Sequence, residues 1–217
     1  MILEFHHVTG ISKKFALQEV SFSLKAGYIM GLAGKNGAGK STLFDYIVNP
    51  KQLYTGEIKI EGIDIQADHN DMMNRIGFIS ERNRFFPEFT CVQCGKLLGS
   101  FYKDWDDIIF YNAMKKMNVS LGKTVGKLSR GEQFKFQTAF AMAHKPALYL
   151  IDEATAGMDP VFRIDYFKIL QQIIAEETAS VLMTSHIQDE MVQKMDYIGI
   201  LEQGKLVKFG EADVVYA

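Results

Sequence analysis

The chain has 217 residues, and its 24 Lys and Arg against 26 Asp and Glu give a formal net charge of −2. This balance gives no electrostatic reason to expect a nucleic-acid partner, and 47% hydrophobic with 23% charged residues argue against extended disorder. The sequence lacks a run of about 18 apolar residues that could span a bilayer, and two cysteines are too few for a disulfide framework. We therefore expect a cytosolic protein of one domain.

Short apolar or β-branched runs alternate along the chain with longer stretches of helical periodicity. The predicted strands are residues 2–9, 17–24, 28–33, 57–60, 75–80, 147–152, 180–184, 197–202 and 205–209, the last two forming a hairpin. The predicted helices are residues 40–48, 92–101, 106–117, 131–143, 161–175 and 187–195. This alternation predicts a mostly parallel sheet with helices on its faces. The strands before residue 30 indicate a smaller antiparallel layer, and residues 91–128 form a helical insertion within one domain.

The first motif follows the predicted strand at residues 28–33. Residues 34–41 read Gly-Lys-Asn-Gly-Ala-Gly-Lys-Ser, which matches the phosphate-loop pattern. Glycines let the backbone turn successive N–H groups toward phosphate oxygens, and the helix that begins near Lys40 adds its positive dipole end. Lys40 can reach the β- and γ-phosphates, and the Ser41 hydroxyl can ligate Mg²⁺. A chance glycine-rich turn is the alternative, but the strand–loop–helix context favours nucleotide binding.

Two acidic residues follow the apolar run of the predicted strand at residues 147–152. Asp152 and Glu153 lie at its carboxyl end, where open α/β sheets bind their ligands. Asp152 is the candidate for the Mg²⁺ coordination sphere, and Glu153 can polarise a water molecule for attack on the γ-phosphate. Alone, the pair could simply end a strand at a solvated turn. The phosphate loop upstream favours the catalytic interpretation.

A third motif, Leu-Ser-Arg-Gly-Glu-Gln at residues 128–133, lies between the first two. Ser129 and Glu132 have the spacing of a capping box at a helix N-terminus. In this position the motif resembles the Leu-Ser-Gly-Gly-Gln signature of the nucleotide-binding subunits of ATP-binding cassette (ABC) transporters, with Arg130 and Glu132 at the two more variable places. The resemblance extends over nearly the whole chain.

The resemblance implies a head-to-tail homodimer or heterodimer in which each ATP lies between one phosphate loop and the other subunit's signature helix. Ser129 and Gly131 then face the γ-phosphate in trans. Residues 156–159 correspond to the D-loop, and His186 corresponds to the switch histidine that positions the attacking water. The resemblance also implies nucleotide contacts from Gly34, Asn36, Gly37, Ala38, Gly39, Lys40, Ser41 and Thr42.

Two elements depart from the family pattern. The glutamine of the Q-loop, which touches Mg²⁺ and reports the nucleotide state to the membrane partner, is replaced by Glu81. A carboxylate still ligates Mg²⁺, whereas the alternative is a solvated loop glutamate. The adenine-stacking aromatic is expected at Phe15, where stacking would contribute about 1–3 kcal/mol. Phe15 could instead pack into the antiparallel layer.

Other conspicuous residues are interpreted as structural. Cys91 and Cys94 lie three apart on a predicted helix, and they are expected to pack as small hydrophobes because no further ligands complete a zinc site. The aromatic residues between 85 and 105 are expected to form mostly the core of the helical insertion. The resemblance places the groove for a coupling helix of the membrane partner beside them, so some could be interface anchors.

The sequence therefore predicts an α/β fold, a P-loop NTPase core with a mostly parallel sheet, an N-terminal antiparallel β layer and an inserted α-helical subdomain at about 91–128. We expect a single ABC ATPase domain over residues 1–217. The resemblance implies ATP and Mg²⁺ as cofactors and a permease in a separate chain, which would hold the protein on the inner face of the membrane. Residues 101–106 look like exporter-type cassettes, so export is expected over import. The alternatives are a soluble ABC-type ATPase acting on ribosomes or DNA and a cassette that binds ATP without turnover.

Overall fold

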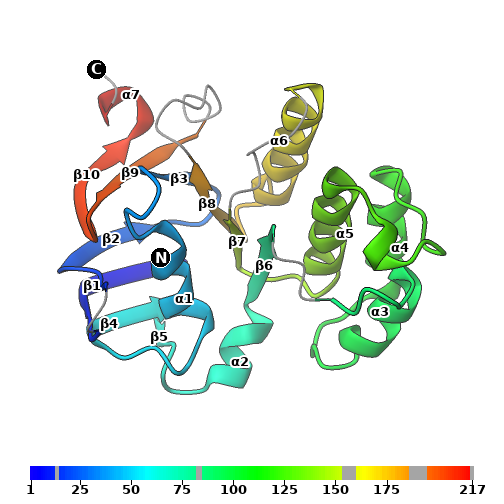
Figure 1. The fold of residues 1–217 in the computed structure, drawn as a ribbon, viewed down its shortest axis with the longest axis horizontal. Coiled ribbons are helices and arrows are strands. Elements are labelled where there is room, and N and C mark those ends of the chain that lie inside the picture. The colour runs from blue at the N-terminus through cyan, green and yellow to red at the C-terminus, as the bar shows by residue number, and fades with distance from the viewer. Residues whose placement is uncertain (13–14, 82–84, 153–159, 186–194, 216–217) are drawn as a thin grey trace.

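The computed structural model describes residues 1–12, 15–81, 85–152, 160–185 and 195–215. The strands of these residues form two sheets (Figure 1). The first is antiparallel, has the order β2-β1-β4-β5, and consists of β1 (Leu3–Gly10), β2 (Val20–Leu24), β4 (Tyr54–Ile60) and β5 (Ile63–Asp64). The second has the order β10-β9-β3-β8-β7-β6 and consists of β3 (Ile29–Ala33), β6 (Ile76–Ser80), β7 (Leu148–Asp152), β8 (Ser180–Ser185), β9 (Tyr197–Glu202) and β10 (Lys205–Glu211). Its neighbours are parallel except for the β9–β10 hairpin.

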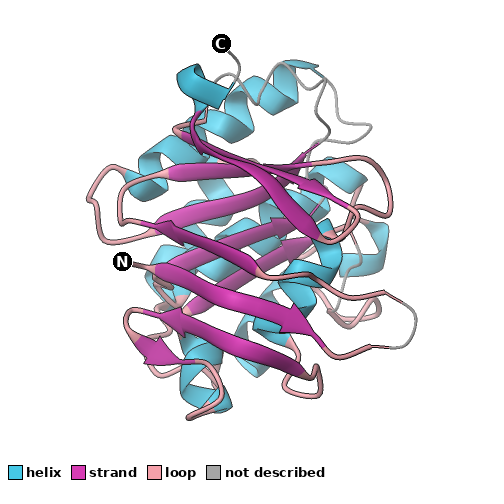
Figure 2. Cartoon of the chain, turned by 90° about the vertical axis from the view of Figure 1, so that its left-hand side faces the viewer, coloured by secondary structure: helices cyan, strands magenta, loops and turns pink. Residues whose placement is uncertain are grey.

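The helices separate into those that cover the parallel sheet and those gathered beyond its β6 edge. They are α1 (Lys40–Val48), α2 (His69–Asn74), α3 (Cys91–Gly99), α4 (Asp107–Lys116), the 3₁₀ turn η1 (Val125–Lys127), α5 (Arg130–Ala143), α6 (Pro160–Ile174) and α7 (Ala212–Val215). Figure 1 shows α3, α4 and α5 together at the end of the molecule opposite the antiparallel sheet. Figure 2 shows the strands of both sheets in front, with most helices behind them. Within the described ranges, no helix is long and apolar enough to cross a membrane.

The parallel sheet is buried on both faces, which explains its nearly continuous apolar strands. In β7, Leu148 and Leu150 belong to the core shared with α1 and the antiparallel sheet, whereas Tyr149 and Ile151 belong to the core beneath α6. Successive side chains of a strand point to opposite faces, so residue parity decides on which face each side chain lies. This alternation also orients the polar residues at the strand ends.

A third core lies within the helical region. Phe110, Phe136 and Phe140 pack there with Cys91 and Cys94, and both thiols are free and buried. Burial raises the pKa of the Cys91 thiol to about 11, which keeps it protonated and unreactive at neutral pH. The prediction that the two cysteines pack as apolar residues is confirmed.

The predicted fold class is confirmed, although some boundaries differ. The strands near the N-terminus belong to two sheets, because β3 joins the parallel sheet while β4 and β5 complete the antiparallel one with β1 and β2. Sequence periodicity missed α2, which has only six mostly polar residues and begins where the Asp68 side chain accepts a hydrogen bond from the Asp71 N–H. It also missed β5 and α7, which are two and four residues long. The predicted helix over 187–195 lies almost entirely outside the described residues.

Candidate nucleotide-binding site

The phosphate loop connects a fully buried strand, β3, to the first turn of α1. Gly37 and Gly39 have φ angles of 79° and 113°, and residues with a side chain are strained in this left-handed region. A Cβ atom on Gly34 would come within 2.5 Å of the Leu201 carbonyl oxygen. The loop therefore needs glycine at these three positions for reasons of conformation and space.

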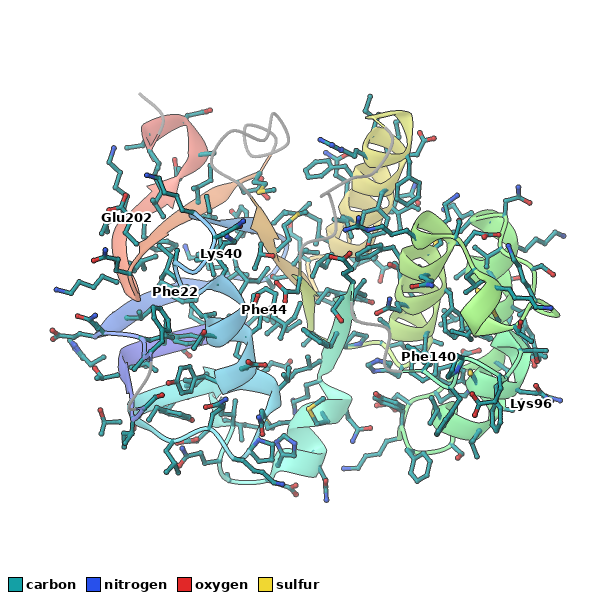
Figure 3. All side chains as sticks on the ribbon, viewed as in Figure 1. Phe22, Lys40, Phe44, Lys96, Phe140 and Glu202 are labelled. Carbon is teal, nitrogen blue, oxygen red and sulfur yellow. The ribbon has the colours of Figure 1, made fainter. Side chains whose placement is uncertain are left out.

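Lys40 forms the centre of this loop. It is 6% exposed, and its Nζ donates hydrogen bonds to the carbonyl oxygens of Gly34 at 2.7 Å and Lys35 at 3.2 Å. The Ala38 carbonyl accepts a hydrogen bond of 2.8 Å from the N–H of Gly204 in the β9–β10 turn. Figure 3 shows Lys40 in the half of the molecule away from Phe140 and the helical region. The loop is thus closed around the ammonium group and anchored to the sheet.

Three oxygen-bearing side chains meet beside the first turn of α1. Asp152 Oδ1 accepts hydrogen bonds from Thr184 Oγ1 at 2.9 Å and Ser41 Oγ at 3.3 Å. Asp152 and Thr184 lie near the carboxyl ends of the neighbouring strands β7 and β8. Each lies two residues after a leucine of the core that α1 shares, so both side chains point to the face of the sheet that α1 covers. Hydroxyl and carboxylate oxygens fit a hard divalent cation, which keeps several water ligands of its own.

The structure places Ser41 and Asp152, both predicted as metal ligands, within hydrogen-bond distance of each other, and it adds Thr184, which sequence reasoning had not assigned. The sequence could have revealed Thr184, because a strand placed beside β7 would carry its side chain on the same face of the sheet as that of Asp152. Asn36, Gly37 and Ser41 are exposed and Thr42 is half-buried. The outer side of the loop is therefore open to a ligand.

Glu81 has a different partner from the one expected. Its Oε1 lies 2.9 Å from Nη2 of Arg130, the first residue of α5, and the two side chains are 48% and 40% exposed. Ser80 pairs with Asp152 across β6 and β7, so the next residue, Glu81, has the opposite parity and reaches the α5 side of the sheet. Metal ligation by Glu81 stays a prediction.

Phe15 lies against the phosphate loop. A Cβ atom on Gly39 would be 3.0 Å from two atoms of its ring, and the residue is 37% exposed. The following segment is held in place by the Gln18 N–H, which donates to the Gly204 carbonyl at 2.8 Å. The same turn thus anchors both Phe15 and the loop, and stacking of this ring on adenine stays a prediction.

The signature helix α5 begins with the predicted capping box. Ser129 Oγ accepts a hydrogen bond from the Glu132 N–H at 3.3 Å, and Glu132 Oε2 accepts one from the Ser129 N–H at 2.7 Å. Hydrogen bonding to Lys123 keeps the pKa of Glu132 below its usual value. A Cβ atom on Gly131 would meet nothing closer than 3.9 Å, so the first turn of α5 is open to approach.

Two predicted catalytic residues and one predicted dimer contact lie outside the described part of the chain. These are Glu153, His186 and the D-loop segment 156–159.

A family model described as ABC transporter matches residues 17–156, which is more than half of the chain. This chain belongs to the ABC transporter family. Members of the family bind nucleotide and are ATPases, and the chain is an ATP-binding subunit with their fold.

Individual comparisons agree with this family assignment. The ABC transporter ATP-binding protein YtrB of Bacillus subtilis (strain 168) is 29% identical over 91% of this chain and 67% of its own length. The bacitracin transport ATP-binding protein BcrA of Bacillus licheniformis is 28% identical over 92% of this chain and 67% of its own. A solved structure titled as the ATP binding subunit of an ABC transporter has a TM-score of 0.88 and 23% identity, covering 99% of this chain and 92% of that one.

Proposed function

We propose that this ABC subunit hydrolyses ATP to drive export through a permease in a separate chain. The observation that supports the proposal most is the preformed cradle, in which buried Lys40 lies at the centre of the loop and Asp152 is oriented by two hydroxyl groups. Such an arrangement suits a bound triphosphate because its donors need little reorganisation.

In the proposed site, the loop residues 34–39 and Lys40 hold the β- and γ-phosphates, while Ser41 and Asp152 hold Mg²⁺. The metal ion, when bound, neutralises charge on the phosphate oxygens. Glu153 acts as the base that orients the attacking water, and His186 hydrogen-bonds the γ-phosphate. Phe15 stacks on the adenine, which its position beside Gly39 supports.

The second half of the proposed site comes from another subunit. The open first turn of α5, with Ser129 and Gly131, faces the γ-phosphate held by the partner subunit. A helix N-terminus favours an anion through its N–H groups and dipole. The partner is a second copy of this chain or a related ATPase subunit.

The proposed permease contact is a groove of about 850 Å³ between α2 and the helical region. Its lining includes the apolar or aromatic residues Phe85, Leu98, Phe101 and Tyr102, and also Asp68. Phe101 is 76% exposed, as expected of an anchor for a partner helix. Contact with a permease would hold the subunit at the inner face of the membrane.

Two finer points belong to the same proposal. Residues 1–217 act as one ATPase domain with its helical subdomain at about 91–128, as the separate core around Phe110 supports. Export is favoured over import because two of the relatives are named for bacitracin transport and linearmycin resistance.

The proposal is tested by measuring phosphate release and ATP binding for the wild type and for Glu153→Gln. We expect the substitution to abolish most turnover while ATP binding persists, because it removes the base without touching the cradle. His7→Gln, an exposed histidine on β1, serves as a control and should hydrolyse ATP normally. Wild-type turnover by Glu153→Gln would remove Glu153 from its proposed role. Purification from native membranes should also recover a polytopic partner, whereas recovery of ribosomes would contradict the transport role.

A further inference from the structure

Thr184 is a polar residue in an otherwise apolar part of the core. It follows Val181, Leu182 and Met183 in β8, which are at most 1% exposed, and it is itself 1% exposed. A valine would fill nearly the same space and suit a strand equally well, whereas a buried hydroxyl group costs free energy unless it is hydrogen-bonded. Packing of the sheet therefore gives no reason for a hydroxyl group at this position.

The strand order places Thr184 between the two parts of the cradle. The strand β8 lies between β3, which leads into the phosphate loop, and β7, which ends at Asp152 (Figure 1). Thr184 pairs with Leu32 in the register of β3 and β8, while its Oγ1 donates a hydrogen bond of 2.9 Å to Asp152 Oδ1. One residue thus joins the strand of the loop to the carboxylate that lies one strand further along the sheet.

The two hydroxyl groups that contact Asp152 Oδ1 differ in their access to a ligand. Ser41 is exposed, and its Oγ is 3.3 Å from Oδ1, so its oxygen can also serve a ligand that enters from solvent. Thr184 is buried and makes the shorter contact. Its hydroxyl group therefore holds the carboxylate from within the protein, as the partners of metal ligands commonly do.

We propose that Thr184 is a positioning residue that orients the Asp152 carboxylate toward the phosphate loop and thereby sets the affinity of the cradle for the metal ion of Mg–ATP. Thr184 acts through Asp152 and touches neither the nucleotide nor the metal ion. The inference rests on the proposed function, in which Asp152 holds Mg²⁺. Without the Thr184 hydroxyl group, the remaining described contact of Oδ1 is the longer one, with Ser41.

The test is the dissociation constant of Mn²⁺, a paramagnetic substitute for Mg²⁺, measured by electron paramagnetic resonance with a saturating non-hydrolysable ATP analogue. Thr184→Val removes the hydroxyl group and should weaken Mn²⁺ binding about 10-fold, as loss of a group that orients a metal ligand does. Thr184→Ser retains the hydroxyl group and should bind Mn²⁺ like the wild type. Thr184→Ala removes the same group without adding bulk and should weaken binding at least as much as Thr184→Val.

Ser180→Ala is the matched control. Ser180 lies at the other end of β8, is 0% exposed, and donates a hydrogen bond of 2.6 Å to the Lys25 carbonyl. Its loss removes a buried hydroxyl group from the same strand, so it should affect stability and leave Mn²⁺ affinity unchanged. An equal weakening in Ser180→Ala and Thr184→Val would show a general effect of the strand and overturn the inference.

A second comparison repeats Thr184→Val in an Asp152→Ala background, where no carboxylate remains to be oriented. The double variant should bind Mn²⁺ like Asp152→Ala alone. An equal weakening in both backgrounds, wild-type affinity in Thr184→Val, or failure of Thr184→Ser to restore binding would overturn the inference while leaving the nucleotide site intact. Absence of any analogue binding by the wild type would instead contradict the proposed function.

Discussion

The N-termini of α1 and α5 both suit a phosphate group, but they differ in capping and in exposure to solvent. The helix α1 has Gly39 as its N-cap and no side-chain cap within the described residues, and the loop before it is closed around buried Lys40. The helix α5 has Ser129 as its N-cap, is capped by its own side chains, and begins with the exposed Arg130. The first N-terminus leaves its N–H groups available for a ligand, whereas the second is satisfied locally and exposed to solvent.

The difference fits the proposal that one chain holds half of a composite site. The α1 side is preorganised because Lys40, which closes its loop, is buried, so we expect it to bind nucleotide without help from a second subunit. The α5 side is held at its middle by Gln137 and at its C-terminal end by His144, while its N-terminus is capped by its own side chains and pairs with Lys123 and Glu81 through partly exposed ion pairs. Four changes break or sharpen this contrast.

The largest expected effect is on the α1 side. Lys40→Ala removes the ammonium group that closes the loop and that would contact the phosphates, so nucleotide affinity should fall at least about 100-fold, or roughly 3 kcal/mol. Isothermal titration calorimetry with ATP measures this loss. Lys35→Ala is the matched control, because Lys35 is an exposed loop residue whose main-chain carbonyl contacts Lys40. Equal losses in the two variants would contradict the special role of Lys40.

The C-terminal end of α5 should make stability depend on pH. His144 is buried against Tyr102, with ring centroids 4.0 Å apart, and its Nδ1 lies 3.4 Å from the Asn74 carbonyl oxygen. Burial lowers the pKa of His144 to about 4 from 6.5. The unfolded chain then binds the extra proton between these values, so stability is complete above about pH 6.5 and falls as the pH drops toward 4.

This histidine should account for about 3 kcal/mol of the acid destabilisation. The measurement is the free energy of unfolding by urea at several pH values between 4 and 7. His144→Gln, which cannot be protonated, should show a shallower decline than the wild type, whereas the exposed His7→Gln should decline like the wild type. Parallel curves for the wild type and His144→Gln would contradict the burial effect.

The side chain of Gln137, in the middle of α5, hydrogen-bonds to both main-chain groups of Ser80 in β6, so its removal should lower the free energy of unfolding. Gln137→Ala removes both hydrogen bonds between this side chain and the buried main chain of Ser80, and we expect a loss of about 2 kcal/mol in unfolding free energy. Thermal or urea unfolding measures it. Gln172→Ala is the control, since its exposed side chain contacts only the Lys116 ammonium among the hydrogen bonds described. A loss of unfolding free energy no greater than that of the control would show that the Gln137–Ser80 hydrogen bonds do not stabilise the packing of α5 against β6.

The smallest expected effect distinguishes two glycines of the phosphate loop. Alanine at Gly37 meets only the strain of a positive φ, about 1 kcal/mol, because no atom lies within 4 Å of its Cβ position. Alanine at Gly39 adds a contact of 3.0 Å with the Phe15 ring. We expect Gly39→Ala to be about 1 kcal/mol less stable than Gly37→Ala in the same unfolding assay. Equal losses would show that Phe15 moves aside freely.

Sequence reasoning identified residues whose placement depends on local interactions. The phosphate loop from Gly34 to Ser41 is specified by its own glycines and the adjoining strand and helix, and Asp152 follows from a single apolar run. Thr184 was missed because its role depends on which strand lies beside β7. The pairing of Glu81 with Arg130 was missed because it depends on the packing of α5 against β6, which joins residues far apart in the chain. The hydrogen bonds between Gln137 and Ser80 were missed for the same reason, because they also join residues far apart in the chain.

The most direct test of a two-half site is the molar mass of the Glu153→Gln protein with and without Mg–ATP, measured by light scattering during size exclusion. With nucleotide we expect twice the single-chain mass of 24.6 kDa, and without nucleotide we expect the single-chain mass. Adding Lys40→Ala should abolish the dimer, because the cradle on the α1 side can no longer hold the shared phosphates. A protein that binds ATP by calorimetry yet remains a single chain at every concentration would contradict the claim that α5 supplies the second half of the site.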